Sequence, residues 1–239
     1  MKQLLIVNWK MNMNLVSVQT FMDNFSTLNI NHNNAEIIIC PSVIHIPILK
    51  DYNLSYVNIG AQDCSIFQNF GAQTGEVCAS MLAELGVKYV ILGHCERRYL
   101  GENEDMILSK IDASLKANII PIVCFGEDEH EHLTMDTWTI VQQKLSFLKG
   151  LNHKNTIVIA YEPIWSIGSG KIPDNLYINS ILTHAKQYLK DDGYLFVYGG
   201  SVTAKNARDI LKISDGLLIG SASLEVTKLY DIMMCYHGL

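Results

Sequence analysis

Glu162 is the residue whose type and position say most about chemistry. It follows an apolar run at 157–160 and precedes a long loop at 163–173 that contains Gly168 and Gly170. A carboxylate at the end of a strand, under a loop that can close and exclude water, is suited to act as a general base. A surface glutamate at the start of a loop is the alternative, and position alone leaves both open.

Two other side chains could assist such a base. His94 follows the apolar run 89–92, and a short helix opening at Glu96 would disfavour its charged form, leaving a neutral imidazole that can donate to a carbonyl oxygen. Lys10 lies two residues after Asn8, so on a strand both side chains would point the same way, and an inward lysine would need an anion. A structural histidine and a lysine paired with Glu96 are the alternatives.

Small residues follow the last two apolar runs of the chain. They are Gly199, Gly200 and Ser201 in one turn, and Gly220 and Ser221 in the other. Small side chains let backbone N–H groups approach a phosphate, and the start of a helix adds a favourable dipole. The two turns therefore predict a phosphate site.

The segment GEDEHEH at 126–132 looks at first like a metal cluster. Matched ligands do not occur elsewhere in the sequence, so we interpret it as a solvated charged face. Nucleotide-binding motifs are also missing, and we expect no metal and no other cofactor.

Eight short apolar runs, rich in Ile, Val and Leu and without polar alternation, predict strands buried on both faces. They span residues 4–7, 37–40, 57–61, 89–92, 119–123, 157–160, 195–197 and 216–219. Helical segments are predicted at 16–26, 78–85, 104–117, 137–149, 175–189, 206–213 and 224–236. This alternation predicts an α/β fold, a closed (β/α)8 barrel forming a single domain over residues 1–239, with all the polar strand ends at one face.

Composition limits the partners and the location. The net charge is −6 with no basic run, so we expect no nucleic-acid partner. No apolar stretch reaches membrane-spanning length, so we expect no membrane partner. Six scattered cysteines without a CxxC pair or a secretion signal favour reduced thiols and a cytoplasmic location. The loop from Gln62 to Val77 is long enough to suggest a function of its own.

Nine motifs, in this order, resemble the triosephosphate isomerase family over essentially the whole chain. They are NWKMN at 8–12, GAQD at 60–63, TGE at 74–76, GHCERR at 93–98, CFGE at 124–127, YEPIW at 161–165, GSGK at 168–171, YGGSV at 198–202 and DGLLIGSASL at 215–224. The resemblance implies a TIM barrel and a cofactor-independent isomerase of glycolysis and gluconeogenesis. Its substrate would be a small phosphorylated triose, with dihydroxyacetone phosphate and D-glyceraldehyde 3-phosphate interconverted through an enediolate.

The resemblance also implies a role for each catalytic candidate. Glu162 would be the base that moves the proton, and His94 the neutral electrophile. Lys10 would be the cation beside the substrate, with Asn8 lining the same pocket and Glu96 as the partner of Lys10.

Further roles concern the phosphate, the lid and the partner subunit. Trp165 would be a hinge of the lid, which is the loop at 163–173, with Glu127 accepting its indole N–H. Thr74 would reach into the other subunit's site in a homodimer formed through the loop from Gln62 to Val77. The residues that the resemblance implies for substrate binding are Asn8, Lys10, Gly168, Ser201, Gly220 and Ser221.

The chain departs from the family pattern at five positions. Cys95 and Ser221 replace the usual Ser and Gly, Ser166 and Ser169 replace Ala and Thr in the lid, and Asp63 replaces Asn. None of these changes removes a catalytic group, so they bear on rate and lid kinetics.

Two other functions remain open from the sequence. One is another phosphosugar isomerase or epimerase on the same barrel, because fold alone does not separate these enzymes. The other is an inactive barrel kept as a binding or structural protein. That protein would be expected to have lost Lys10, His94 or Glu162, and all three are present.

Overall fold

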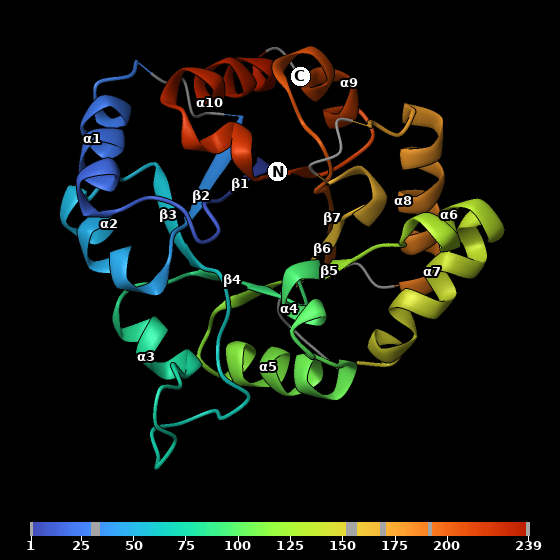
Figure 1. Ribbon diagram of the computed structural model, residues 1–239, viewed down its shortest axis with the longest axis horizontal. Coiled ribbons are helices and arrows are strands. Elements are labelled where there is room, and N and C mark those ends of the chain that lie inside the picture. Colours follow the sequence, from blue (N-terminus) through green and yellow to red (C-terminus); the bar gives the residue numbers. More distant parts are fainter. Residues whose placement is uncertain (1, 30–33, 152–156, 168–170, 191–192, 238–239) are drawn as a thin grey trace.

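The computed structural model describes residues 2–29, 34–151, 157–167, 171–190 and 193–237. Its parallel strands form a closed barrel in chain order, and β1 pairs with both β2 and β8 (Figure 1). The strands are β1 Gln3–Asn8, β2 Ala35–Cys40, β3 Val57–Ala61, β4 Tyr89–Leu92, β5 Ile120–Phe125, β6 Ile157–Tyr161, β7 Tyr194–Tyr198 and β8 Gly216–Ile219. The predicted (β/α)8 barrel is confirmed.

The strands are apolar on both faces because each face is covered. In β1, Leu4 and Ile6 belong to the cluster that fills the barrel interior. Leu5 and Val7 belong to the larger cluster between the strands and the helices. Alternate residues therefore enter two different cores, which explains why the sequence shows no polar alternation along a strand.

The helices surround the barrel (Figure 1). They are α1 Leu15–Ser26, α2 Ile46–Tyr52, α3 Ala79–Glu84, α4 Cys95–Tyr99, α5 Glu104–Lys116, α6 Glu129–Thr134, α7 Thr137–Leu145, α8 Asn175–Leu189, α9 Ala204–Leu211 and α10 Val226–Met233. Within the described part of the chain, no helix combines the length and the apolar character needed to cross a membrane.

Local capping explains where the predicted helices were right and where they were not. Helix α8 has the predicted bounds, and Asp174 caps it by accepting the N–H of Tyr177. Helix α9 begins two residues earlier than expected, because Thr203 and Asn206 form a capping box. The sequence analysis missed α2 and α6, and both are short. The predicted helix at 224–236 is shorter as α10, with 3-10 turns on either side.

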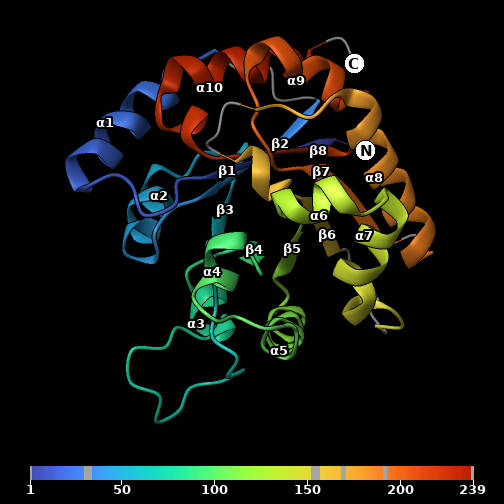
Figure 2. The same ribbon diagram turned by 45° about the vertical axis from the view of Figure 1, so that its right-hand side comes forward.

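The loop at 62–77 extends away from the barrel between β3 and α3 (Figure 2). Thr74 is exposed on this loop, as are the rings of Phe67 and Phe70. The loop therefore presents apolar side chains outside the body of its own barrel.

Gly126 lets two strand ends approach each other closely. It follows β5, and a Cβ atom at this position would lie 1.7 Å from the carbonyl oxygen of Glu162, which follows β6. A side chain at position 126 would thus push apart the backbones that hold Glu162.

Gly126→Ala should lower the free energy of unfolding by about 1–3 kcal/mol, the usual effect of overpacking. Gly71→Ala is the matched control, because nothing lies within 4 Å of the added Cβ at that exposed glycine. Urea denaturation of both variants and the parent checks this. Equal stabilities for the two variants would contradict the close approach.

Candidate active site

A cavity of about 830 Å³ opens at the carboxyl ends of the strands. Seven of the predicted site residues line it: Asn8, Lys10, His94, Glu162, Ser201, Gly220 and Ser221. Gly168 lies outside the described residues. Thr74 is exposed on the loop at 62–77 and does not line this cavity. These seven predicted residues come from five different strand ends, so the sequence identified part of the lining of the pocket.

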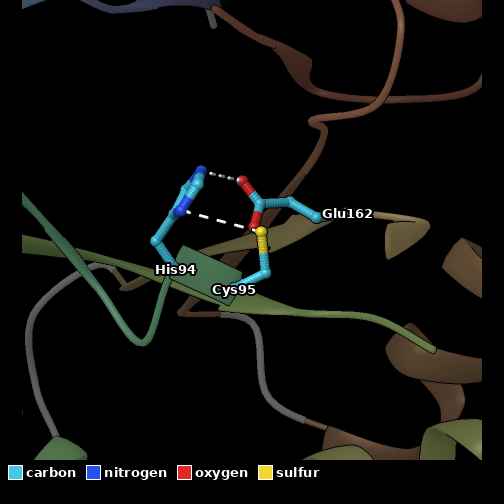
Figure 3. Close-up of side chains that lie close together, drawn as sticks. All are labelled: His94, Cys95 and Glu162. Carbon is cyan, nitrogen blue, oxygen red and sulfur yellow. Dashed lines mark hydrogen bonds and ion pairs between the residues drawn. The ribbon is translucent and has the colours of Figure 1, made fainter. Parts of the chain in front are cut away.

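Glu162 is a buried carboxylate directly after β6, with 2% of its surface exposed. Its Oε1 lies 3.3 Å from Nε2 of His94 (Figure 3). Burial raises the pKa of Glu162, and the raise is opposed by His94, Lys10, the thiol of Cys124 and the backbone N–H of Cys95. A carboxylate with a raised pKa binds a proton more strongly, which suits a general base.

Two glycines make room for this carboxylate. Gly126 allows the backbone contact described above, and a Cβ atom at Gly199 would lie 2.9 Å from Cγ of Glu162. The sequence analysis assigned Gly199 to phosphate binding and gave Gly126 no role. The signal for Gly126 was the glycine of CFGE, which stands directly after a strand.

His94 is held in one tautomer by the helix that follows it. It is the N-cap residue of α4, and its Nδ1 accepts the backbone N–H of Glu96 at 3.2 Å. A neutral ring with Nδ1 as acceptor carries its proton on Nε2, the nitrogen that faces Glu162. The predicted short helix is present, and it leaves His94 a donor at Nε2.

Lys10 reaches the pocket by a different backbone route from the one predicted. The prediction that Lys10 continues the strand of Asn8 is wrong, because β1 ends at Asn8 and Lys10 has a φ of 52°. The Asn8 side chain accepts the backbone N–H of Lys10 at 2.9 Å and so stabilises this turn. The Lys10 Nζ atom lies 2.7 Å from Oε1 of Glu96, the expected partner.

The two turns predicted to bind phosphate lie next to each other on the pocket wall. A 3-10 turn runs over Ser221–Leu224, with Gly220 as its N-cap residue. Ser221 has no positive φ, so a serine fits this position without backbone strain. The Ser201 hydroxyl donates to the carbonyl oxygen of Ser166 at 2.9 Å, which ties this turn to the first part of the lid.

Glu127 anchors the base of the lid. Its Oε1 accepts the indole N–H of Trp165 at 2.7 Å, the contact expected from the sequence, and the hydroxyls of Tyr161 and Tyr177 at 2.9 and 3.2 Å. Burial raises the pKa of Glu127, and these hydrogen bonds oppose the raise. The ring of His132 stacks on Trp165 with centroids 4.1 Å apart. The interpretation of 126–132 as a solvated face is therefore wrong for Glu127 and His132.

A buried ion cluster behind His94 was missed from the sequence. Lys110 on α5 is 3% exposed, lies 2.7 Å from Asp63 and contacts Glu102. The other oxygen of Glu102 accepts the N–H of Gly93, directly before His94. Burial works against the charge of Lys110, but these two carboxylates leave its pKa raised. The signal was a lysine on the apolar face of a helix, where an unpaired charge is not stable.

Comparison with known proteins gives one consistent result. The family model described as triosephosphate isomerase matches residues 3–236. Triosephosphate isomerase of Finegoldia magna is 38% identical over 240 residues, covering 94% of each chain. The enzymes of Aquifex aeolicus and Mycoplasma mobile are each 34% identical, and the alignments cover 94% and 97% of this chain and 96% and 99% of theirs.

Replacing Glu162 with glutamine should change how stability depends on pH. The pKa of Glu162 is raised in the folded protein from its ordinary value of 4.5. At pH values above 4.5 the folded protein therefore binds more protons than the unfolded chain, so the free energy of unfolding falls as the pH rises. Glutamine does not ionise, so the stability of Glu162→Gln relative to the parent should increase as the pH rises above the ordinary carboxyl pKa of 4.5. Urea denaturation at one fixed protein concentration measures this.

Glu129→Gln is the control for that measurement. Lys171 lowers the pKa of the exposed Glu129, so its ionised form stabilises the fold and the relative stability of this variant should fall as pH rises. A pH-independent difference for Glu162→Gln would contradict the raised pKa.

Proposed function

Because the chain belongs to the triosephosphate isomerase family, its reaction is the interconversion of dihydroxyacetone phosphate and D-glyceraldehyde 3-phosphate, and we propose that Glu162, His94 and Lys10 carry it out. This is a step of glycolysis and gluconeogenesis. The observation that carries the residue assignment is the 3.3 Å contact between Glu162 and Nε2 of His94 inside the pocket. Family membership sets aside other phosphosugar isomerases, and the presence of all three groups argues against an inactive barrel.

In this mechanism the substrate inserts between Glu162 and His94. The Glu162 carboxylate takes a proton from C1 of dihydroxyacetone phosphate, and the electron pair of the broken C–H bond moves toward the C2 carbonyl oxygen. The Nε2–H of His94 donates to that oxygen as it gains charge, and the Lys10 ammonium stabilises the resulting enediolate. The hydroxyl proton on the C1 oxygen moves to the C2 oxygen by way of Nε2 of His94, and Glu162 returns the carbon-bound proton to C2. These two transfers leave a carbonyl at C1 and a hydroxyl at C2, which is the aldehyde product.

Backbone N–H groups at Ser201, Gly220 and Ser221 are proposed to hold the phosphate, with Gly168 in the lid completing the site. The small residues and the 3-10 turn beginning at Ser221 support this assignment. Trp165 is proposed as the lid hinge because its indole is fixed to the buried Glu127. A base and an electrophile are sufficient for proton transfer between adjacent carbons, so the proposed mechanism uses no metal or other cofactor.

The protein is proposed to be a homodimer formed through the loop from Gln62 to Val77. Phe70 is 60% exposed on this loop and Met11 is 96% exposed beside a second cavity, of about 500 Å³. Exposed apolar side chains next to a cavity are typical of a surface that another chain covers. In the dimer, Thr74 would approach the partner's catalytic pocket.

A single domain over residues 1–239 and a cytoplasmic location complete the proposal. All six cysteines are free thiols, which is usual in a reducing compartment.

Glu162→Asp should lower kcat by on the order of 100-fold, because shortening the side chain withdraws the base by about 1 Å. Inhibition by 2-phosphoglycolate should change little, since the phosphate turns are untouched. A coupled assay for each direction of the reaction measures kcat, and Glu129→Asp on the exposed start of α6 is the matched control. Near-normal turnover of Glu162→Asp would rule out Glu162 as the base.

Thr74→Arg should weaken the dimer, because it places a bulky charge at the tip of the proposed interface loop. Sedimentation velocity should then show monomer at concentrations where the parent is dimeric, and activity should fall with the dimer fraction. Thr183→Arg, on the exposed side of α8, should leave both unchanged. A parent chain that is monomeric and fully active at assay concentration would contradict the proposal.

A further inference from the structure

His132 is a titratable side chain that lies directly against the start of the lid. It belongs to α6, and its ring stacks on the indole of Trp165 with centroids 4.1 Å apart and an angle of 21° between the ring planes. The ring of Tyr177, at the start of α8, makes an edge contact with it at 4.8 Å. His132 therefore contacts aromatic rings from the lid and from the helix that follows the lid.

The ring of His132 also faces the carboxylate that anchors Trp165. Its Nδ1 atom lies 3.9 Å from Oε1 of Glu127, the oxygen that accepts the indole N–H. This nitrogen is buried and has no hydrogen-bond partner among the described residues, although 26% of the side chain is exposed. Protons can therefore reach the ring from solvent, and a protonated ring would place its charge beside a buried carboxylate.

Protonation of His132 should strengthen both of these contacts. A cation over the face of an aromatic ring is attracted by that ring, and tryptophan gives the strongest contact of this kind. A positive charge 3.9 Å from the Glu127 carboxylate also gains Coulomb energy that a neutral imidazole lacks. If Trp165 left its hydrogen bond to Glu127, it would lose the contact with this cation as well. Trp165 should therefore open less often when His132 is charged.

Other ionisable side chains lie around the pair of His132 and Glu127. They are Tyr161 at the end of β6, Tyr177 on α8, Glu129 on α6, and Lys171 of the lid, which pairs with Glu129. Burial raises the pKa of both tyrosines, and the contact with Lys171 lowers the pKa of Glu129. These three groups therefore keep their charge state near neutral pH.

Glu127 is the remaining group that could respond to pH, and its effect has the opposite sign. Burial raises the pKa of Glu127. A proton on this carboxylate would weaken the acceptor of the indole N–H, so Trp165 would be held less tightly at acidic pH. The direction of the change with pH therefore distinguishes protonation of His132 from protonation of Glu127.

We propose that His132 is a positioning residue for the lid, and that a proton on its ring holds Trp165 against Glu127 more tightly. The hold on Trp165 follows from the contacts of His132 and does not depend on catalysis. Its effect on turnover rests on the proposed function, in which the lid hinges at Trp165. Slower release of this hinge at acidic pH slows the lid and lowers turnover.

Solvent exchange of the indole N–H groups tests the hold directly. In the full chain labelled with ¹⁵N-tryptophan, each indole N–H gives one resonance, and the resonance missing from Trp165→Phe belongs to Trp165. Protection is the slowing of exchange relative to a free indole at the same pH. Between about pH 8 and pH 5, where histidines titrate, protection of the Trp165 N–H should rise about 2- to 5-fold, as expected for one cation–π contact at a partly exposed ring.

Three variants separate His132 from the groups around it. In His132→Gln the rise in protection toward acidic pH should be absent. In His132→Arg, which keeps a permanent planar charge, protection should be high at every pH. His130→Gln, at an exposed position of the same helix, should behave like the parent. Protection that is flat or falls toward acidic pH in the parent would overturn the proposal, and so would a rise that persists in His132→Gln.

Activity separates the hold on Trp165 from its effect on the lid. The kcat of His132→Gln divided by that of the parent should rise about 2- to 5-fold as the pH falls over the same range, because the variant loses the tighter hold. A ratio that does not change with pH would overturn the effect on turnover, while the hold would stand. A chain that shows the change in protection but has no isomerase activity would overturn the proposed function instead.

Discussion

An ionisable carboxylate buried at the mouth of the barrel is the constraint on which the rest of the site depends. Water would stabilise the charge of Glu162, but it would also weaken Glu162 as a base, so the charged form has to be stabilised by fixed protein groups. The Nε2–H of His94 and the backbone N–H of Cys95 supply that stabilisation from one strand end. Gly126 and Gly199 lack side chains where the carboxylate and its backbone need the space.

A second buried carboxylate, Glu127, relates this site to the lid. Glu127 holds Trp165 by a hydrogen bond, and Tyr177 brings α8 to the same oxygen. The two carboxylates are close in the fold because β5 and β6 are neighbours, with Phe125 opposite Tyr161. One pair of strands therefore positions both the proposed base and the anchor of the loop that covers it.

The barrel and the strand-end residues of the pocket could be predicted from the sequence because their signals are local. A run of apolar residues, a helix-start pair such as Pro173 and Asp174, or a glycine after a strand depends only on its neighbours in the chain. The path of Lys10 could not be predicted, since its carbonyl oxygen is held by the distant Ser42 and Gln62 as well as by the turn with Asn8. The burial of Glu127 could not be predicted either, since it depends on contacts between distant segments. Lys110 is an intermediate case. The sequence shows that it lies on the apolar face of a helix, but it does not show that Asp63 is its ion-pair partner.

Closure of the barrel also has a consequence for synthesis on the ribosome. β1 emerges first, yet one of its edges pairs with β8, and the hydroxyl of Tyr236 donates to the carbonyl oxygen of Leu4. Until the last segment leaves the exit tunnel, the first strand carries an open row of backbone donors and acceptors, the feature that promotes edge-to-edge association of nascent chains. Slower translation of the segment that carries β8 and Tyr236 would lengthen this exposure.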